Sequence, residues 1–292
     1  MEINIKNLTK KYGGKTAVDK INIDLQDGIY GLLGANGAGK TTILKILCSV
    51  LYPTEGTVYF NGRNISLMGK EYRRLLGYLP QEFGYYPDFT AWEFMLYVAS
   101  LKGISKRSAK PEIIELLSSV GLSKAADKKI HTFSGGMKQR LGIAQSLLNH
   151  PKILVMDEPT AGLDPKERIR FRELLKDYSE NSIVIISTHI VSDLENTANH
   201  ILLMKEGKLL LSSQVMEIKG HMAGKVWTCI CAKSEMEHYY KKFCVTNRRD
   251  VEDGVELRIV GNIKPCNEAR TSVGNLEDLY MYYFQERGDV GD

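Results

Sequence analysis

Apolar and polar residues alternate through most of the first thirty positions of the chain. A period of two is typical of strands that bury one face, so this pattern predicts a half-buried antiparallel sheet. Residues 153–156 and 183–186 differ, because both runs are short and almost entirely apolar. Such runs predict strands buried on both faces, as in a parallel sheet covered by helices. The alternating apolar residues are Ile3, Ile5, Ile21, Ile23 and Leu25.

Between these strands, apolar residues recur with the spacing of a helix. Residues 43–51 carry an apolar stripe that predicts one helix directly after a glycine-rich loop. Three further stretches, residues 92–102, 111–120 and 137–148, are also helical in pattern. They predict a helical subdomain at about residues 84–150, inserted between the strands.

A change of pattern marks a domain boundary. Residues 201–204 and 208–211 flank a short loop with glycine, which predicts a hairpin. Residues 212–224 then lose periodicity. We therefore expect a first domain over residues 1–215 and a second over residues 225–292.

The second domain is expected to be a small α+β unit. Strand-like and helix-like stretches alternate in it, with two strands around Asp253. Ser234 and Asn275 are predicted to start its two helices, because each has an acidic residue three positions later. The final helix is expected over residues 276–285.

Composition narrows the class of protein. The chain has 292 residues, 43% apolar and 25% charged, as in an ordinary globular protein. Its net charge of +4 gives no electrostatic reason to expect nucleic-acid binding. No apolar run approaches the roughly 20 residues that span a bilayer, and the first residues do not resemble a secretory signal.

The cysteines do not predict a disulfide framework or a metal centre. Five cysteines, an odd number, are scattered through apolar surroundings, which is typical of reduced intracellular thiols. Cys229 and Cys231 form a close pair, but no second pair or histidine follows at ligand spacing.

Residues 34–41 match the phosphate-binding pattern G-x-x-x-x-G-K-[ST] in full. The motif follows a predicted strand and precedes a predicted helix, which is the context of a P-loop. Backbone N–H groups and the helix dipole would hold the phosphates, Lys40 would reach the β- and γ-phosphates, and the Thr41 hydroxyl would bind Mg²⁺. The predicted nucleotide contacts in this segment are Gly34, Asn36, Gly37, Ala38, Gly39, Lys40, Thr41 and Thr42.

An acidic motif after a buried strand indicates hydrolysis. The apolar run at residues 153–156 ends in Asp157, which suits an aspartate that holds Mg²⁺ directly or through water. Glu158 follows at once, where a general base could polarise a water molecule against the γ-phosphate.

Residues 133–140 form a second phosphate-binding candidate. Ser134, Gly135 and Gly136 open a predicted helix, and a hydroxyl with two glycine amides at that position can cradle phosphate. The alternative is that Ser134 is an ordinary N-cap. The segment resembles the signature sequence of ATP-binding cassette (ABC) proteins, although Phe133 stands where leucine is usual and Ala35 of the P-loop where many relatives have proline.

The resemblance covers the first 212 residues in motif order and implies roles for several residues. Tyr12 resembles the aromatic residue that stacks on adenine, and Gln81 the glutamine that contacts Mg²⁺ and the attacking water. Residues 161–164 resemble the loop that contacts the opposite subunit, and His189 the histidine that contacts the γ-phosphate. A surface tyrosine, a loop glutamine and a loop histidine are the alternatives.

The fold implied is α/β, a P-loop NTPase core with an antiparallel β subdomain and a helical subdomain, followed by the small C-terminal α+β domain. The resemblance implies an ATPase that uses ATP and Mg²⁺. Two copies, as a homodimer or paired cassette, would enclose two ATP molecules, with Ser134, Gly135 and Gly136 contacting the ATP of the opposite subunit.

The same resemblance implies a transporter subunit that powers a separate transmembrane permease. The permease would be contacted near residues 83–87, from Phe83 to Pro87, and the chain would be cytoplasmic, peripheral on the inner face of the membrane. Residues 275–280 resemble the end of exporter ATPases, so export is favoured. The alternatives are a soluble non-transport ABC ATPase acting on nucleic acid or ribosomes, and a nucleotide-binding regulator without turnover. The resemblance disfavours the first alternative, because chromosome and repair relatives insert a coiled coil between residues 41 and 133, where no heptads occur, and translation relatives carry two cassettes. Glu158 and His189 together disfavour the regulator.

Overall fold

The structure is a computed structural model that describes residues 1–284, and it divides the chain into two compact units, Met1–Ser212 and Ser213–Asp292. No helix among the described residues is both long enough and apolar enough to cross a membrane.

An antiparallel sheet opens the first unit, in the order β2-β1-β4-β5. Its apolar residues face inward: Ile3 and Ile23 are 0% and 6% exposed, and their polar neighbours lie outside. The prediction of a half-buried antiparallel sheet is therefore confirmed. The strands are β1 (Glu2–Tyr12), β2 (Lys15–Gln26), β4 (Glu55–Phe60) and β5 (Arg63–Asn64).

A second, six-stranded sheet has the order β10-β9-β3-β8-β7-β6. Its strands from β9 to β6 pair in parallel, and every residue of β7 and β8 is buried. Both buried apolar runs were predicted. Its strands are β3 (Gly28–Leu33), β6 (Leu76–Leu79), β7 (Ile153–Asp157), β8 (Ile183–Ser187), β9 (His200–Lys205) and β10 (Lys208–Gln214).

The predicted hairpin joins β9 to β10. Glu206 and Gly207 form its turn, with φ angles of 50° and 79°. Positive φ at both central positions matches the twist of the flanking strands, so a two-residue loop suffices.

Helix α1 (Lys40–Leu47) packs between the two sheets, and one hydrophobic core cluster includes its apolar side and residues of both sheets. The helix is shorter than predicted. It ends at Leu47, and Val50, which the predicted stripe included, is 62% exposed. Other helices around the sheets are α2 (Ile65–Met68), α3 (Lys70–Arg74), α7 (Pro165–Ser179) and α8 (Val191–Glu195).

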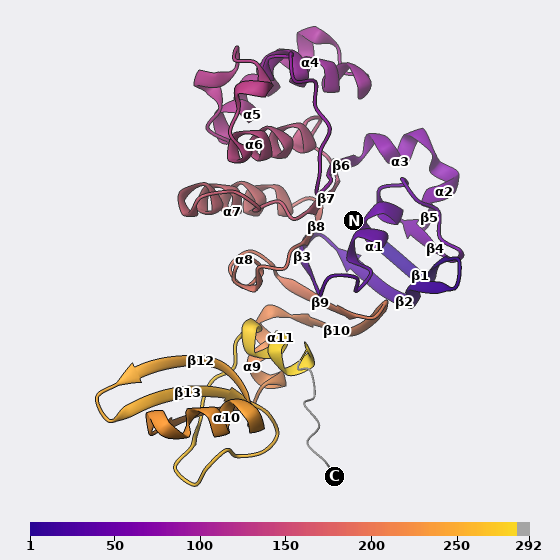
Figure 1. Ribbon diagram of the computed structural model, residues 1–292. Coiled ribbons are helices and arrows are strands. Elements are labelled where there is room, and N and C mark those ends of the chain that lie inside the picture. Colours follow the sequence, from indigo (N-terminus) through magenta and orange to yellow (C-terminus); the bar gives the residue numbers. More distant parts are fainter. Residues whose placement is uncertain (285–292) are drawn as a thin grey trace. The chain divides into compact units, whose positions relative to one another are not determined.

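Three helices form a separate region between β6 and β7 (Figure 1). They are α4 (Ala91–Leu101), α5 (Lys106–Ser119) and α6 (Gly135–Leu147). Thr90 and Glu93 form a capping box at α4. Helix α5 begins five residues before the predicted start at Pro111, because Ser105 caps it, so the proline lies inside the helix.

The second unit contains an antiparallel sheet in the order β12-β13-β11-β14 with short helices. Asn275 starts α11 as predicted, since its Oδ1 accepts the N–H of Asp278 at 2.8 Å. Ser234 was a wrong prediction: Glu235 accepts the N–H of Ala232, and the segment begins there as a 3₁₀ turn. The predicted end of α11, Gln285, lies outside the described residues. Elements of this unit are β11 (Val226–Cys231), β12 (Cys244–Val251), β13 (Gly254–Val260), β14 (Arg270–Thr271), α9 (Ile218–His221), α10 (Met236–Lys242) and α11 (Leu276–Phe284).

Candidate nucleotide-binding site

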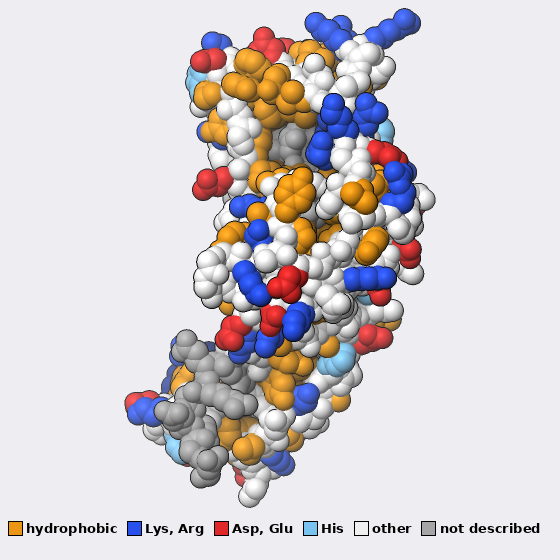
Figure 2. Space-filling model, turned by 90° about the vertical axis from the view of Figure 1, so that its right-hand side faces the viewer, with side chains coloured by type: hydrophobic (Ala, Val, Ile, Leu, Met, Phe, Trp, Pro, Cys, Tyr) orange, Lys and Arg blue, Asp and Glu red, His pale blue; other side chains and the backbone are white. Residues whose placement is uncertain are grey.

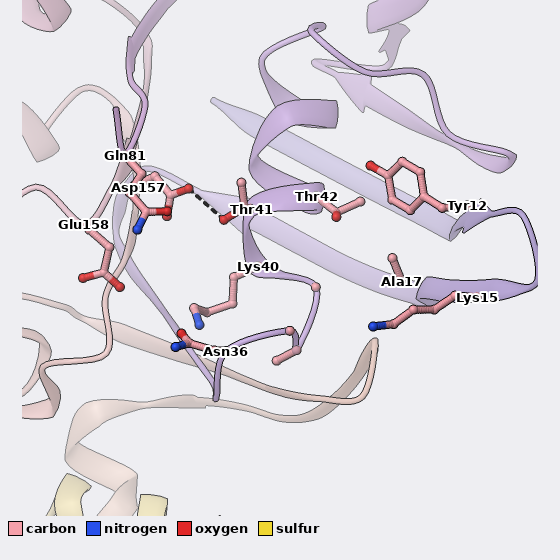
Figure 3. Close-up of a pocket in the computed structure, with 13 residues that line it drawn as sticks. Tyr12, Lys15, Ala17, Asn36, Lys40, Thr41, Thr42, Gln81, Asp157 and Glu158 are labelled. Carbon is pink, nitrogen blue, oxygen red and sulfur yellow. Dashed lines mark hydrogen bonds between the residues drawn. The ribbon is translucent and has the colours of Figure 1, made fainter. Parts of the chain in front are cut away.

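A cavity of about 480 Å³ opens between the P-loop and the turn that joins β1 to β2. Figure 3 shows the P-loop and the start of α1 on one side of it and the hairpin with Tyr12 on the other. Residues from four separate stretches of sequence therefore meet at one site. The lining residues are Tyr12, Lys15, Ala17, Asn36, Gly37, Ala38, Gly39, Lys40, Thr41, Thr42, Gln81, Asp157 and Glu158.

The P-loop glycines hold the backbone in conformations that other residues resist. Gly37 and Gly39 have φ angles of 81° and 102°. A Cβ on Gly39 would also lie 2.3 Å from the carbonyl oxygen of Ala17, and one on Gly34 would lie 2.4 Å from that of Met204. Gly34 thus packs against β9 and is not among the lining residues. The loop is fixed against the hairpin and the sheet by these close backbone contacts.

Lys40 is held on the P-loop itself. Its Nζ donates to the carbonyl oxygens of Gly34 at 2.7 Å and Ala35 at 3.2 Å. Burial lowers the pKa of Lys40, and the negative charges of Glu158 and Asp157 oppose that shift. The ammonium group is therefore positioned at the cavity wall before any phosphate arrives.

Asp157 joins the end of β7 to the start of α1. The Thr41 hydroxyl donates to its Oδ2 at 2.8 Å, and the Ser187 hydroxyl donates to its Oδ1. Asp157 is only 2% exposed, so these bonds compensate for burying the carboxylate. Thr41, Asp157 and Gln81 all line the cavity, and Figure 3 shows the Thr41 hydroxyl bonded to the Asp157 carboxylate.

Glu158 has a strained backbone and an oriented side chain. Its φ of 53° lies in the left-handed region, where a non-glycine residue persists only if its surroundings impose it. Oε2 accepts the Thr188 hydroxyl at 3.0 Å and lies 2.9 Å from His189 Nδ1. The Gln139 amide donates to the carbonyl of Glu158 at 3.2 Å, which ties α6 to this turn.

Several predicted site residues lie outside the cavity of their own chain. His189 contacts Glu158, and its side chain is 64% exposed. Ser134, Gly135 and Gly136 are not lining residues. The Ser134 hydroxyl accepts the N–H of Met137 at 3.2 Å, so the N-cap alternative is realised in this structure.

Lys15 and Ala17 line the cavity but were not predicted as site residues. A signal for them was present in the sequence. They follow Tyr12 across the two-glycine stretch Gly13-Gly14, and a hairpin turn there places residues of β2 beside the predicted aromatic contact.

The P-loop before α1, the acid at the end of β7 and the glycine-bearing start of α6 define the class as an ATP-binding cassette of the P-loop NTPases. A sequence model described as ABC transporter matches residues 18–161. YxlF of Bacillus subtilis (strain 168), an uncharacterized ABC transporter ATP-binding protein, is 38% identical over 82% of this chain and 80% of its own. The chain belongs to the ABC transporter family as an ATP-binding subunit and ATPase.

Other relatives agree in class. The bacitracin transport ATP-binding protein BcrA of Bacillus licheniformis is 42% identical over 71% of this chain and 68% of its own. The bacterial ABC transporter cassette MJ0796, solved as a dimer, is 29% identical, covering 73% of this chain and 98% of that chain with a TM-score of 0.68. The same cassette has been solved after hydrolysis with ADP and Pi bound, at 28% identity and a TM-score of 0.66.

Proposed function

We propose that this chain powers export through a separate transmembrane permease, and that two copies or paired cassettes close around two ATP molecules. The proposal of a dimer rests on one observation: the predicted ATP contacts of a single chain do not all lie in one cavity. The P-loop, Asp157 and Glu158 share one cavity, whereas Ser134 lies outside it in the same chain. A second chain would supply the Ser134 segment, and the similar cassette MJ0796 has been solved as a dimer.

Thr41, Gln81 and Asp157 are the proposed Mg²⁺ ligands. A hydroxyl, an amide carbonyl and a carboxylate are the hard oxygen donors that Mg²⁺ prefers, directly or through water, and all three line the cavity. When bound, Mg²⁺ would neutralise charge on the β- and γ-phosphate oxygens. The same Asp157 carboxylate already orients the Thr41 hydroxyl at 2.8 Å.

Glu158 is the proposed general base. Its carboxylate would accept a proton from the water that attacks the γ-phosphate, while Lys40 would hold the phosphate and Gln81 the water. Thr188 and His189 position the carboxylate, at 3.0 Å and 2.9 Å. In the proposed cycle, His189 would turn to the γ-phosphate once ATP is enclosed. Tyr12 would stack on adenine, and its 49% exposure leaves a ring face free for that.

The permease is proposed to dock near residues 83–87. Two sets of ring contacts tie this segment to α4: Phe83 contacts Phe94 at 5.9 Å, and Tyr86 and Phe89 contact Tyr97. Tyr86 remains 49% exposed. Figure 2 shows hydrophobic side chains gathered over this helical region. Partly exposed aromatic clusters suit a protein interface.

The proposal of export rests on the transport and resistance roles that the names of related proteins give. BcrA is a bacitracin transport protein, SrtF of Streptococcus pyogenes a lantibiotic transport protein, and LnrL of Bacillus subtilis a linearmycin resistance protein. We accordingly place this chain at the inner face of the cell membrane, attached through its permease. Residues 1–215 would be the ATPase domain, with its helical subdomain at about 84–150, and residues 225–292 an accessory domain.

Glu158→Gln tests both the base and the dimer. Turnover should fall by about 100-fold or more, because the amide cannot accept the proton. ATP should then accumulate unhydrolysed, and size-exclusion chromatography with ATP should give a dimer. Glu173→Gln, an exposed acid on α7, is the matched control. Wild-type turnover of Glu158→Gln would exclude the base assignment, and a monomer at every ATP concentration would exclude the dimer.

Fractionation of the native cell separates transport from the alternative ATPase roles. The chain should copurify with a multi-helix membrane protein, and Tyr86→Asp should weaken that association. Tyr52→Asp is the control, since Tyr52 is also exposed, at 70%, but lies outside the proposed docking segment. Copurification with ribosomes or nucleic acid, and not with a membrane protein, would contradict the proposal.

A further inference from the structure

Lys15 is a cation of the nucleotide cavity that belongs to none of the phosphate-binding motifs. It is the first residue of β2, and its side chain lines the cavity together with Tyr12 and Ala17. Figure 3 shows the side chain extending from the hairpin toward the P-loop. Its amine therefore approaches the space between the aromatic residue and the phosphate-binding loop.

The hairpin register fixes this position. Tyr12 and Lys15 are directly opposite partners at the end of the antiparallel pair, so their side chains project from the same face. Ala17 shares that face because it is two residues further along the strand. The close contact between Gly39 and the Ala17 carbonyl holds this face against the P-loop. Lys15 is thus within a lysine side chain's reach of a bound nucleotide.

The charges of the cavity leave a role for Lys15. Among the described lining residues, Lys15 and Lys40 are the cations, and Asp157 and Glu158 are the anions. Lys40 is engaged by two carbonyl oxygens, whereas the Lys15 side chain is exposed and makes no hydrogen bond or ion pair with any residue between 1 and 284. A bound polyphosphate adds negative charge to this balanced lining, so a cation that has no other partner at its edge is attracted to it.

We propose that Lys15 binds the α-phosphate of the nucleotide, an inference that rests on the proposed ATP site. Adenine on Tyr12 and the terminal phosphates on Lys40 place the α-phosphate between the hairpin and the P-loop. The Lys15 ammonium donates to that phosphate, and it thereby selects a phosphorylated ligand on the hairpin side of the site. Its contribution is to nucleotide affinity, so KM changes and kcat does not.

Binding of ADP, AMP and adenosine to the full chain, measured by displacement of a fluorescent nucleotide, tests this role. Lys15→Met keeps the apolar stem of the side chain. It should weaken the binding of ADP and of AMP by about fivefold, which is the effect of one partly exposed charge contact. Adenosine should bind unchanged. Lys15→Arg should restore ADP affinity to within about twofold, and the loss in Lys15→Met should shrink from about 0.1 M to about 1 M salt through screening.

Lys11→Met is the matched control. Lys11 lies on the same hairpin, faces away from Tyr12 and forms an exposed ion pair with Glu55 at 3.0 Å. It should leave ADP affinity unchanged. Equal losses for ADP and adenosine in Lys15→Met, or no loss at all, would overturn the role of Lys15 while leaving the ATP site intact. Failure of the wild-type chain to bind ADP would instead overturn the proposed function.

Discussion

At the residue scale, the two central P-loop glycines are required for different reasons. Gly37 has positive φ, but a Cβ there would have no atom within 4 Å. Gly39 combines positive φ with a backbone oxygen 2.3 Å from its absent Cβ. The first glycine is constrained by backbone strain alone, and the second also by the close approach of β2.

Gly39→Ala should therefore cost more than Gly37→Ala. Strain alone costs about 1–2 kcal/mol, whereas Gly39→Ala must also displace the Ala17 backbone. We expect Gly39→Ala to abolish ADP binding and to lower the urea midpoint clearly more than its matched control Gly37→Ala. Urea unfolding and ADP titration measure both effects. Equal destabilisation by the two variants would contradict the packing argument.

Lys102 is a half-buried cation that connects the helical region to the sheet. Its Nζ donates to the carbonyl of Leu148 at 2.7 Å and lies 3.4 Å from that of Leu76. Burial lowers the pKa of Lys102 to about 8, partly opposed by Glu112. The pKa of an unfolded lysine is about 10.4. Between these values the unfolded chain binds more protons, so this group adds stability as pH rises from about 8 and loses it as pH falls.

Lys102→Met should remove this pH dependence. The free energy of unfolding of the wild type, minus that of the variant, should increase between about pH 8 and pH 10 by at most about 1.4 kcal/mol per pH unit. Urea unfolding at several pH values measures the difference. Lys106, at the start of α5, is exposed, so Lys106→Met should leave the pH dependence of the free energy of unfolding unchanged. A constant difference for Lys102→Met across this range would refute the lowered pKa.

At the element scale, an ion pair between Asp278 and Arg258 ties α11 to the sheet of the second unit. Asp278 is 1% exposed and accepts from Arg258 Nε at 2.9 Å. It also accepts the N–H of Asn275 at 2.9 Å, so the same carboxylate caps the helix and binds β13. Burial without such partners would be unfavourable for a carboxylate.

Asp278→Ala should release α11. Removing the Asp278 carboxylate should cost about 1–3 kcal/mol, because the Asn275 N–H loses its acceptor and Arg258 keeps only its hydrogen bond to the Val273 carbonyl. Hydrogen exchange should increase across β13 and α11, while β7 and β8 keep their protection. Glu277→Gln, the exposed neighbour, should have little effect. Unchanged exchange in Asp278→Ala would show that the pair is not the anchor.

At the scale of the whole molecule, a site shared between two chains predicts that one substitution can impair turnover and dimerisation without affecting ADP binding. Ser134→Asp keeps a side chain that caps α6, but adds a negative charge where a phosphate of the opposite ATP is proposed to lie. ADP binding by the single chain should be unchanged, because Ser134 does not line its cavity.

Turnover and ATP-dependent dimerisation of Ser134→Asp should both fall, by about 100-fold for turnover, since the like charges repel in a closed interface. Ser123→Asp, a serine elsewhere in the helical region, serves as the control. ATPase assays and size-exclusion chromatography measure the two effects. Weaker ADP binding together with an unchanged dimer would contradict the two-chain site.

The sequence by itself determined the elements whose signals are local. A P-loop is contiguous, so its glycines, lysine and threonine were visible together, and the apolar runs of β7 and β8 identified buried parallel strands. The start of α5 was misplaced because Pro111 is tolerated inside a helix whose cap, Ser105, lies earlier. The length of α1 was overestimated because Val50 continues the apolar pattern in an exposed position.

Only the tertiary structure decided which distant residues meet. The contact of His189 with Glu158, the close approach of Ala17 on β2 to Gly39 of the P-loop, and the pairing of Arg258 with Asp278 each depend on how strands and helices pack against one another. No period or motif in the chain encodes these contacts, because they arise from packing between segments far apart in sequence. The sequence therefore determined the chemistry that is available, and the fold decided where each group can act.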